Sequence, residues 1–98
     1  MKAVRINAGL LKEIRAKPAE ERRQIGQAIT DSQRSMGQPH LHQGIGLRKL
    51  RADYYEVRVG LKQRLVFEDT DDALVFEMLG DHDDVKRFLK SRYMASEA

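Results

Sequence analysis

The stretch YYEVRVGLKQRLVF, residues 54–67, decides how the second half of the chain folds. Its apolar residues recur at every second position, the spacing of a β-strand with one buried face; they are Tyr55, Val57, Val59, Leu65 and Phe67. Two strands joined by a tight turn keep these residues on one face only if the turn contains an odd number of residues. A three-residue turn at 60–62 places Arg58 directly opposite Arg64, and a five-residue turn makes them diagonal neighbours. The sequence therefore predicts two arginines side by side on the polar face of a hairpin.

Further strands are predicted on either side of this hairpin. GLRKLR, residues 46–51, precedes it, and the alternation of Leu74, Phe76 and Met78 follows it after the turn EDTDDA. Pairing Leu65 with Phe76 and Phe67 with Leu74 would put Arg64 opposite Glu77. The segment DHDDVKRFLKSRY then predicts a closing helix, with Asp81 as its N-cap, and residues 94–98 are expected to form a frayed tail.

The pattern of the first half of the chain predicts a short strand followed by a helical hairpin. Val4 and Ile6 alternate within residues 3–7, helical spacing begins at about residue 8, and Pro18 separates a first helix from a second that runs to about Ser35. GQPHLHQGIG, residues 37–46, is predicted to be a loop. The fold class is therefore α+β, in the order β-α-α-β-β-β-α, with a fourth strand after the helices if residues 46–51 form one. The antiparallel sheet is expected to have the helical hairpin packed on one face and the other face open.

Length and composition limit the kinds of protein that this chain can be. A chain of 98 residues supports one domain, residues 1–98, and the absence of cysteine excludes disulfides and thiolate metal sites. The first residues lack the apolar core of a signal peptide, and no apolar run is long enough for a membrane span, so a cytoplasmic protein without membrane contact is expected. The net charge of +3 permits a nucleic-acid or acidic protein partner without requiring one.

Two interpretations of Arg58 and Arg64 follow from residue types. They can be solvated sheet residues paired with glutamates at positions 56, 68 and 77, each exposed pair contributing about 0–1 kcal/mol. Alternatively, an anion joins them, because two guanidinium groups suit bidentate binding of a phosphate such as that of an RNA or DNA backbone.

The histidines and a basic segment supply the other candidate residues. His82 can act as a general acid or base near neutral pH, or simply lie on the surface at a helix start. A metal site built from His40, His42 and His82 is a weaker possibility, since zinc sites normally add a carboxylate or water. A cationic patch suits phosphate contacts with base stacking, or else a charged edge strand; it consists of Arg48, Lys49 and Arg51, followed by Tyr54.

Residues 47–85, LRKLRADYYEVRVGLKQRLVFEDTDDALVFEMLGDHDDV, resemble the RelE/ParE superfamily of bacterial toxins, particularly its YoeB-like and YafQ-like branches. The resemblance implies a metal-independent endoribonuclease without cofactors, which cuts mRNA on the ribosome and is neutralised by a cognate antitoxin. It implies a chain that is monomeric alone or forms a heteromer with that antitoxin, whose amphipathic segment would cover the sheet or the helical hairpin.

The resemblance also implies roles for individual residues. Arg64 would stabilise the phosphate in the transition state with help from Arg58, and His82 would protonate the departing 5′-oxygen or orient the group that does. YoeB-like toxins use a glutamate as the base, but no acidic residue lies between Gln33 and Arg51 here, so His42, with His40 as second choice, would replace it. Two alternatives stay open: a ParE-like inhibitor of DNA gyrase, and a catalytically inactive interaction module.

Overall fold

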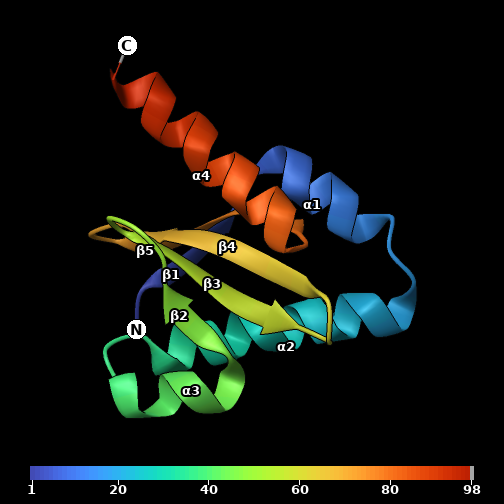
Figure 1. Ribbon diagram of the computed structural model, residues 1–98. Coiled ribbons are helices and arrows are strands. Elements are labelled where there is room, and N and C mark those ends of the chain that lie inside the picture. Colours follow the sequence, from blue (N-terminus) through green and yellow to red (C-terminus); the bar gives the residue numbers. More distant parts are fainter. Residues whose placement is uncertain (98) are drawn as a thin grey trace.

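The computed structural model describes residues 1–97, and side chains are described for residues 1–92. Ten elements follow one another along the chain (Figure 1): β1 (Ala3–Ile6), α1 (Ala8–Arg15), α2 (Ala19–Ser35), the 3-10 helix η1 (Pro39–Leu41), α3 (His42–Ile45), β2 (Leu47–Lys49), β3 (Tyr54–Val59), β4 (Gln63–Asp69), β5 (Ala73–Gly80) and α4 (His82–Glu97). The strands form one five-stranded sheet in the order β1-β5-β4-β3-β2. The α+β class and the predicted order of the main elements are confirmed.

The sheet is mixed, whereas the sequence predicted an antiparallel one. β1 runs parallel to β5, with Ala3 opposite Ala73 and Ile6 opposite Phe76, and the other three pairings are antiparallel. After β1 the chain passes through the helices to β2 at the far edge of the sheet, and then returns strand by strand to β5. Such a long connection between β1 and β5 permits them to pair in parallel. The last strand in sequence therefore lies in the interior of the sheet, between β1 and β4.

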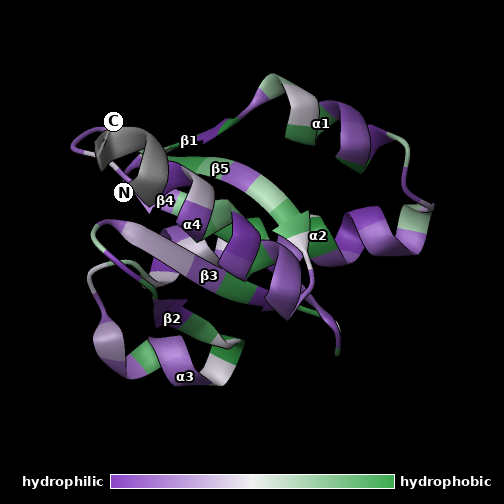
Figure 2. Ribbon diagram, turned by 45° about the horizontal axis from the view of Figure 1, so that its top comes forward, coloured by the Kyte–Doolittle hydropathy of each residue, from purple (hydrophilic) through white to green (hydrophobic). Residues whose placement is uncertain are grey.

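The core lies between the sheet and α2, which crosses one sheet face (Figure 1). Ile25 and Ala28 point from α2 towards the strands. Ser32 is buried beside them, and its hydroxyl is satisfied because Oγ donates to the Ala28 carbonyl at 2.8 Å. The strands contribute fully buried residues, among them Val57, Leu65, Phe67, Leu74 and Phe76. In Figure 2 much of the apolar colour lies along β5, while α4 is largely hydrophilic. None of the described helices is long and apolar enough to cross a membrane.

A β-bulge changes the predicted register between β4 and β5. Val66 pairs with Met78 but Phe67 pairs with Phe76, so Glu77 is the extra residue. An extra residue moves all following side chains to the opposite face, which puts Leu79 in the core in place of Met78. Phe67 also pairs with Phe76 and not with Leu74 as predicted, a displacement of two residues to which the bulge adds one. Arg64 therefore lies opposite Gly80, and the predicted pairing with Glu77 is wrong.

The second sheet face is partly covered by α4, although the sequence predicted an open face (Figure 1). Phe88 of α4 packs edge-on against Tyr54 of β3, with ring centroids 5.6 Å apart, and Arg92 pairs with Glu77 at 2.9 Å. The backbone is helical through Glu97, and Ala98, the last residue of the frayed tail expected from residue 94, lies outside the described residues. The helix thus lies on the same face as the polar side of the hairpin.

The predicted loop at residues 37–46 contains two short helices, η1 and α3. Gly46 ends α3 in the left-handed region, with φ of 69°, which glycine adopts without steric cost. A Cβ at this position would lie 2.9 Å from the Arg58 Cβ, closer than real Cβ atoms approach. Gly46 therefore allows α3 to pack closely against β3.

Candidate active site

Arg58 and Arg64 are direct neighbours across the β3–β4 hairpin. The register pairs them, as well as Val59 with Gln63, across a turn of three residues. Gly60 opens that turn with φ of 62°, a conformation that favours glycine. The geometry predicted from the apolar alternation is confirmed.

A pocket of about 420 Å³ opens where α3 meets the β2–β4 end of the sheet. It gathers residues from five elements, η1, α3 with its C-cap, β2, β3 and β4: Pro39, His42, Gln43, Gly46, Leu47, Arg48, Glu56, Arg58 and Arg64. Four of the predicted site residues thus come together: both hairpin arginines, His42 and Arg48. The pocket combines cations that can hold a phosphate with an imidazole that can move a proton.

Glu56 is a buried carboxylate in the wall of this pocket, and both of its oxygens contact arginines. The Arg64 Nε lies 2.5 Å from Glu56 Oε2, and the Arg48 Nη2 donates to Glu56 Oε1 at 3.2 Å. The glutamate side chain is only 5% exposed, whereas Arg64 is 30% exposed. The pocket holds three guanidinium groups and one carboxylate, so positive charge remains in excess for an anionic ligand.

Among the described side chains, Arg58 differs from Arg48 and Arg64 because no carboxylate pairs with it. It is exposed, it lies against Gly46, and no carboxylate within residues 1–92 forms an ion pair with it. A guanidinium that is not engaged by a carboxylate can donate to a phosphate in a bidentate manner. Arg58 is therefore an exposed cation of the pocket whose guanidinium no described carboxylate engages.

His42 is oriented by the end of α2. Its Nε2 lies 2.8 Å from the carbonyl oxygen of Ser35, the last residue of that helix, whose final carbonyls have no partner within the helix. A carbonyl can only accept, so Nε2 carries the proton and the Nδ1 of the neutral ring keeps a lone pair. This assignment follows from the hydrogen bond, and it gives His42 the form of a general base.

His82 and His40 lie outside the pocket lining. His82 is the first residue of α4, is exposed, and makes no hydrogen bond or ion pair with the described side chains. It follows Gly80, the register partner of Arg64, so it lies at the same end of the strand pair as that arginine. His40 is exposed in η1, and the described residues contain no group of three or more His, Asp or Glu side chains placed to hold a metal ion.

The other predicted RNA-binding residues have different environments. Lys49 is exposed on the edge strand β2, and Arg51 is exposed in the turn after it. Tyr54 is half-buried and packs against Phe88, on the side of the sheet face covered by α4. This contact gives Tyr54 a packing role in the structure, and its stacking on an RNA base stays a prediction.

Two residues that matter for the geometry were not singled out from the sequence. Glu56 was considered only as one of several ion-pair partners, because strand alternation shows its face but not its burial. Ser35 orients His42 through a backbone carbonyl, for which a sequence contains no signal.

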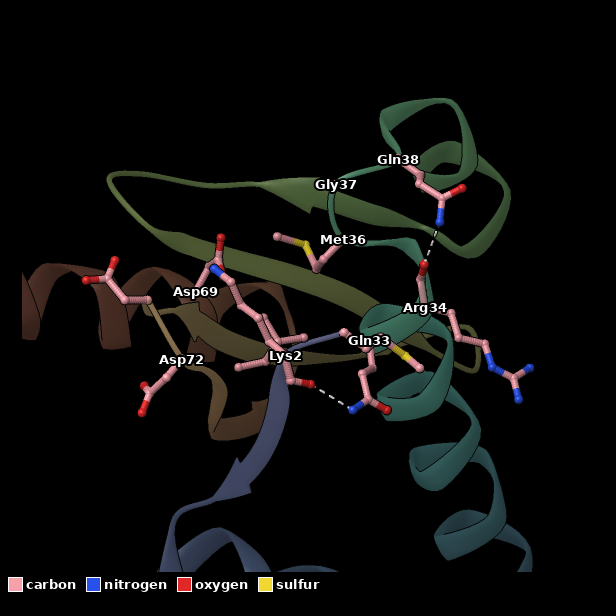
Figure 3. Close-up of a pocket in the computed structure, with 11 residues that line it drawn as sticks. Lys2, Gln33, Arg34, Met36, Gly37, Gln38, Asp69 and Asp72 are labelled. Atoms are coloured by element: carbon pink, nitrogen blue, oxygen red, sulfur yellow. Dashed lines mark hydrogen bonds and ion pairs between the residues drawn. The ribbon is translucent and has the colours of Figure 1, made fainter.

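A larger hollow of about 660 Å³ lies elsewhere, beside the start of β1 and the end of α2 (Figure 3). Lys2 reaches across it to Asp69 at 2.6 Å and to the Thr70 carbonyl at 2.7 Å, and the Asp69 carboxylate raises the pKa of Lys2. Charges of both signs line this hollow, and none of the predicted site residues does. Its ion pair ties the start of β1 to the β4–β5 turn.

The fold is that of the RelE-like toxins. No family model matches the sequence, and no curated protein matches it. Among solved structures, the isolated RelE toxin of E. coli is 20% identical with a TM-score of 0.62, and the match covers 90% of this chain and 99% of RelE. YafQ of E. coli strain BL21(DE3) is 17% identical with a TM-score of 0.62, over 87% of this chain and 98% of YafQ.

Similar structures also include toxins solved together with antitoxins. In the RelB–RelE antitoxin–toxin complex of Methanococcus jannaschii, the matching chain is 20% identical with a TM-score of 0.61, over 86% of this chain and 96% of that one. The matches span nearly the whole length of the neighbouring chains. At these identities the likeness concerns the fold alone.

Proposed function

We propose that this protein is the toxin of a bacterial type II toxin–antitoxin pair and acts as a ribosome-dependent mRNA endonuclease. The observation that carries the proposal is the pocket in which Arg58 and Arg64, paired across the hairpin, lie with His42. The RelE-like fold supports the same proposal, since structures that share it include toxins bound to antitoxins.

The proposed reaction is attack of an RNA 2′-hydroxyl on the adjacent phosphate. Nδ1 of His42 accepts the hydroxyl proton, the 2′-oxygen bonds to phosphorus, and the bond to the 5′-oxygen breaks. Arg58 and the terminal nitrogens of Arg64 stabilise the charge that develops on the phosphate oxygens. The reaction needs a general base, a general acid and cations that stabilise the phosphate. In this proposal His42 is the base, and Arg58 and Arg64 are the cations.

Protonation of the departing 5′-oxygen is assigned to His82 in this proposal. Its exposed ring stands at the start of α4, so the RNA strand has to extend from the pocket towards that end of the helix. Arg48 at the pocket and the nearby Lys49 and Arg51 are proposed to contact neighbouring phosphates. The exposed position of His82 makes its contribution the one that most needs a direct test.

Induction of the protein in bacterial cells, followed by genome-wide mapping of RNA ends, tests the proposal. Growth arrest and new mRNA ends are expected for the wild type and not for Arg64→Ala. Arg22→Ala is the matched control, because Arg22 is an exposed arginine on α2, outside the pocket, and this variant should cleave like the wild type. Growth arrest with intact mRNA and induced DNA damage would instead identify a gyrase inhibitor.

The histidine roles are tested in the same assay. His42→Ala and His82→Ala are both expected to reduce cleavage, whereas His40→Ala should leave it unchanged because His40 is outside the pocket. Full cleavage by His42→Ala would contradict the proposed base. No toxicity of the wild type under strong induction would contradict the nuclease and point to an interaction module.

The proposed partner is a cognate antitoxin that binds this chain and blocks its activity. Complexes of RelE with RelB and of YoeB with YefM share the fold described above. Co-expression of this chain with the protein encoded next to it should restore growth and yield a stable complex on size-exclusion chromatography. Independent migration of the two proteins would contradict this pairing.

A further inference from the structure

Glu56 lines the pocket but has no role in the proposed reaction. It is the one charged residue among the described side chains that is buried, at 4% exposure, and glutamates are rarely buried without a partner. Its partners are the two arginines on either side, in β2 and β4. A buried carboxylate with both oxygens engaged restrains its partners, because releasing either arginine would leave one carboxylate oxygen without a donor in a desolvated site.

The nitrogens that Glu56 contacts determine which nitrogens remain for a ligand. The shortest contact between Glu56 and Arg64 is made through Nε of the arginine, at one side of the guanidinium. Within residues 1–92 the two terminal nitrogens of that guanidinium form no hydrogen bond. The edge formed by these nitrogens has the geometry for bidentate binding of a phosphate, and it belongs to a side chain that Glu56 restrains.

We infer that Glu56 is a positioning residue, which holds the guanidiniums of Arg64 and Arg48 in the orientation that receives an RNA phosphate. The inference rests on the proposed function, since it assigns the pocket to a phosphodiester. The opposite role would be competition, in which the carboxylate occupies the place of the phosphate and weakens binding. Positioning and competition predict changes of opposite sign when the glutamate is altered.

Two substitutions separate these roles. Glu56→Gln removes a negative charge from a cationic pocket, so competition predicts tighter binding of an anion, whereas positioning predicts weaker binding because Arg64 loses its restraint. Glu56→Asp keeps the charge but shortens the side chain, so only positioning predicts weaker binding. We expect both variants to bind about five- to tenfold more weakly, the loss of one charge-assisted contact.

The experiment titrates a 2′-O-methyl RNA trinucleotide, which lacks the attacking hydroxyl, into each protein and follows amide and arginine side-chain NMR signals. The same spectra show whether each variant is folded. Glu68→Gln is the matched control: Glu68 is a carboxylate on the same face, in β4, and does not line the pocket, so this variant should bind like the wild type. In the wild type, the Arg64 Nε–H signal should be protected from solvent exchange before RNA is added.

The outcomes distinguish this inference from the proposed function. If Arg64→Ala binds the trinucleotide as tightly as the wild type, the pocket is not the RNA site and the proposed function fails. If Arg64→Ala weakens binding but folded Glu56→Asp does not, the site stands and positioning is contradicted. Tighter binding by Glu56→Gln would establish competition. Rapid exchange of the wild-type Arg64 Nε–H would contradict the restraint even if a variant failed to fold.

Discussion

Gly46 is a pocket residue without a side chain, and the placement of Arg58 in the pocket depends on it. Gly46 combines a left-handed backbone with a close approach to Arg58, so any side chain there is both strained and crowded. The part of the neighbour that a Cβ would meet is the Arg58 Cβ, which is fixed by the strand and cannot move aside as a flexible tip could. The position of Arg58 therefore depends on a residue that has no chemistry of its own.

Replacing Gly46 by alanine should lower the free energy of unfolding by about 1–3 kcal/mol, the cost of a strained backbone position. Gly26→Ala is the matched control, because Gly26 lies within α2 with open space around it, and it should raise stability by about 0.5–1 kcal/mol. Urea unfolding followed by circular dichroism measures both. Equal stability of Gly46→Ala and the wild type would contradict the close approach.

At the level of elements, α4 is anchored by reciprocal hydrogen bonds at its first turn. The Asp84 N–H donates to Asp81 Oδ1 at 2.9 Å, and the Asp81 N–H donates to Asp84 Oδ2 at 2.9 Å, which confirms the predicted N-cap. Asp84 also pairs with Arg87, and it packs on Gly80, where a Cβ would lie 2.6 Å from the Asp84 Cβ. These contacts fix the start of the helix, and with it His82.

The capping contacts predict a pH dependence of stability. The backbone hydrogen bond from Asp81, together with Arg87, lowers the pKa of Asp84 below its usual value, so the folded state favours the carboxylate more than the unfolded state does. The stabilisation is complete above the unfolded pKa and is lost as pH falls through the folded one. Unfolding between about pH 5 and pH 2.5 should therefore show a smaller loss of stability for Asp84→Asn than for the wild type. Identical pH profiles would contradict this contribution.

The elements also show where sequence reasoning succeeds and where it ends. The β3–β4 hairpin was predicted down to the pairing of Arg58 with Arg64, because only an odd turn keeps its apolar residues on one face. The bulge at Glu77 could not be predicted, since Met78 and Leu79 are both apolar and either could fill the core position. The apolar spacing of α4 indicated that it packs on something, but only tertiary structure determines which sheet face it covers.

In the whole molecule, α2 lies on one face of the sheet and α4 on the other (Figure 1). The core lies on the α2 face, and the strand residues of the pocket share the other face with α4. The pocket residues come from η1, α3 and three strands, so their convergence depends on the complete fold. His42 was a candidate base only through the resemblance, because nothing in a polar loop indicates that it folds into a helix beside the arginines.

The core assignment predicts a difference between two isoleucines of α2. Ile25 is 1% exposed and faces the strands, whereas Ile29 is only partly buried at the edge of the core. Ile25→Val should lower the free energy of unfolding by about 0.5–1.5 kcal/mol, and Ile29→Val by less, because the cavity it leaves is open to solvent. Urea unfolding of the two variants provides the comparison. A larger loss for Ile29→Val would contradict the placement of α2.

The chemistry of the RNA ends tests the central claim most directly. Attack by the 2′-hydroxyl in the pocket of Arg58, Arg64 and His42 leaves a 2′,3′-cyclic phosphate on one fragment and a 5′-hydroxyl on the other. Ligation-based sequencing that distinguishes end groups, applied to RNA from cells that express the wild type, should find these ends at the induced cut sites, and they should be lost with Arg64→Ala. Ends with a 3′-hydroxyl and a 5′-phosphate, or ends that persist in Arg64→Ala, would contradict the account.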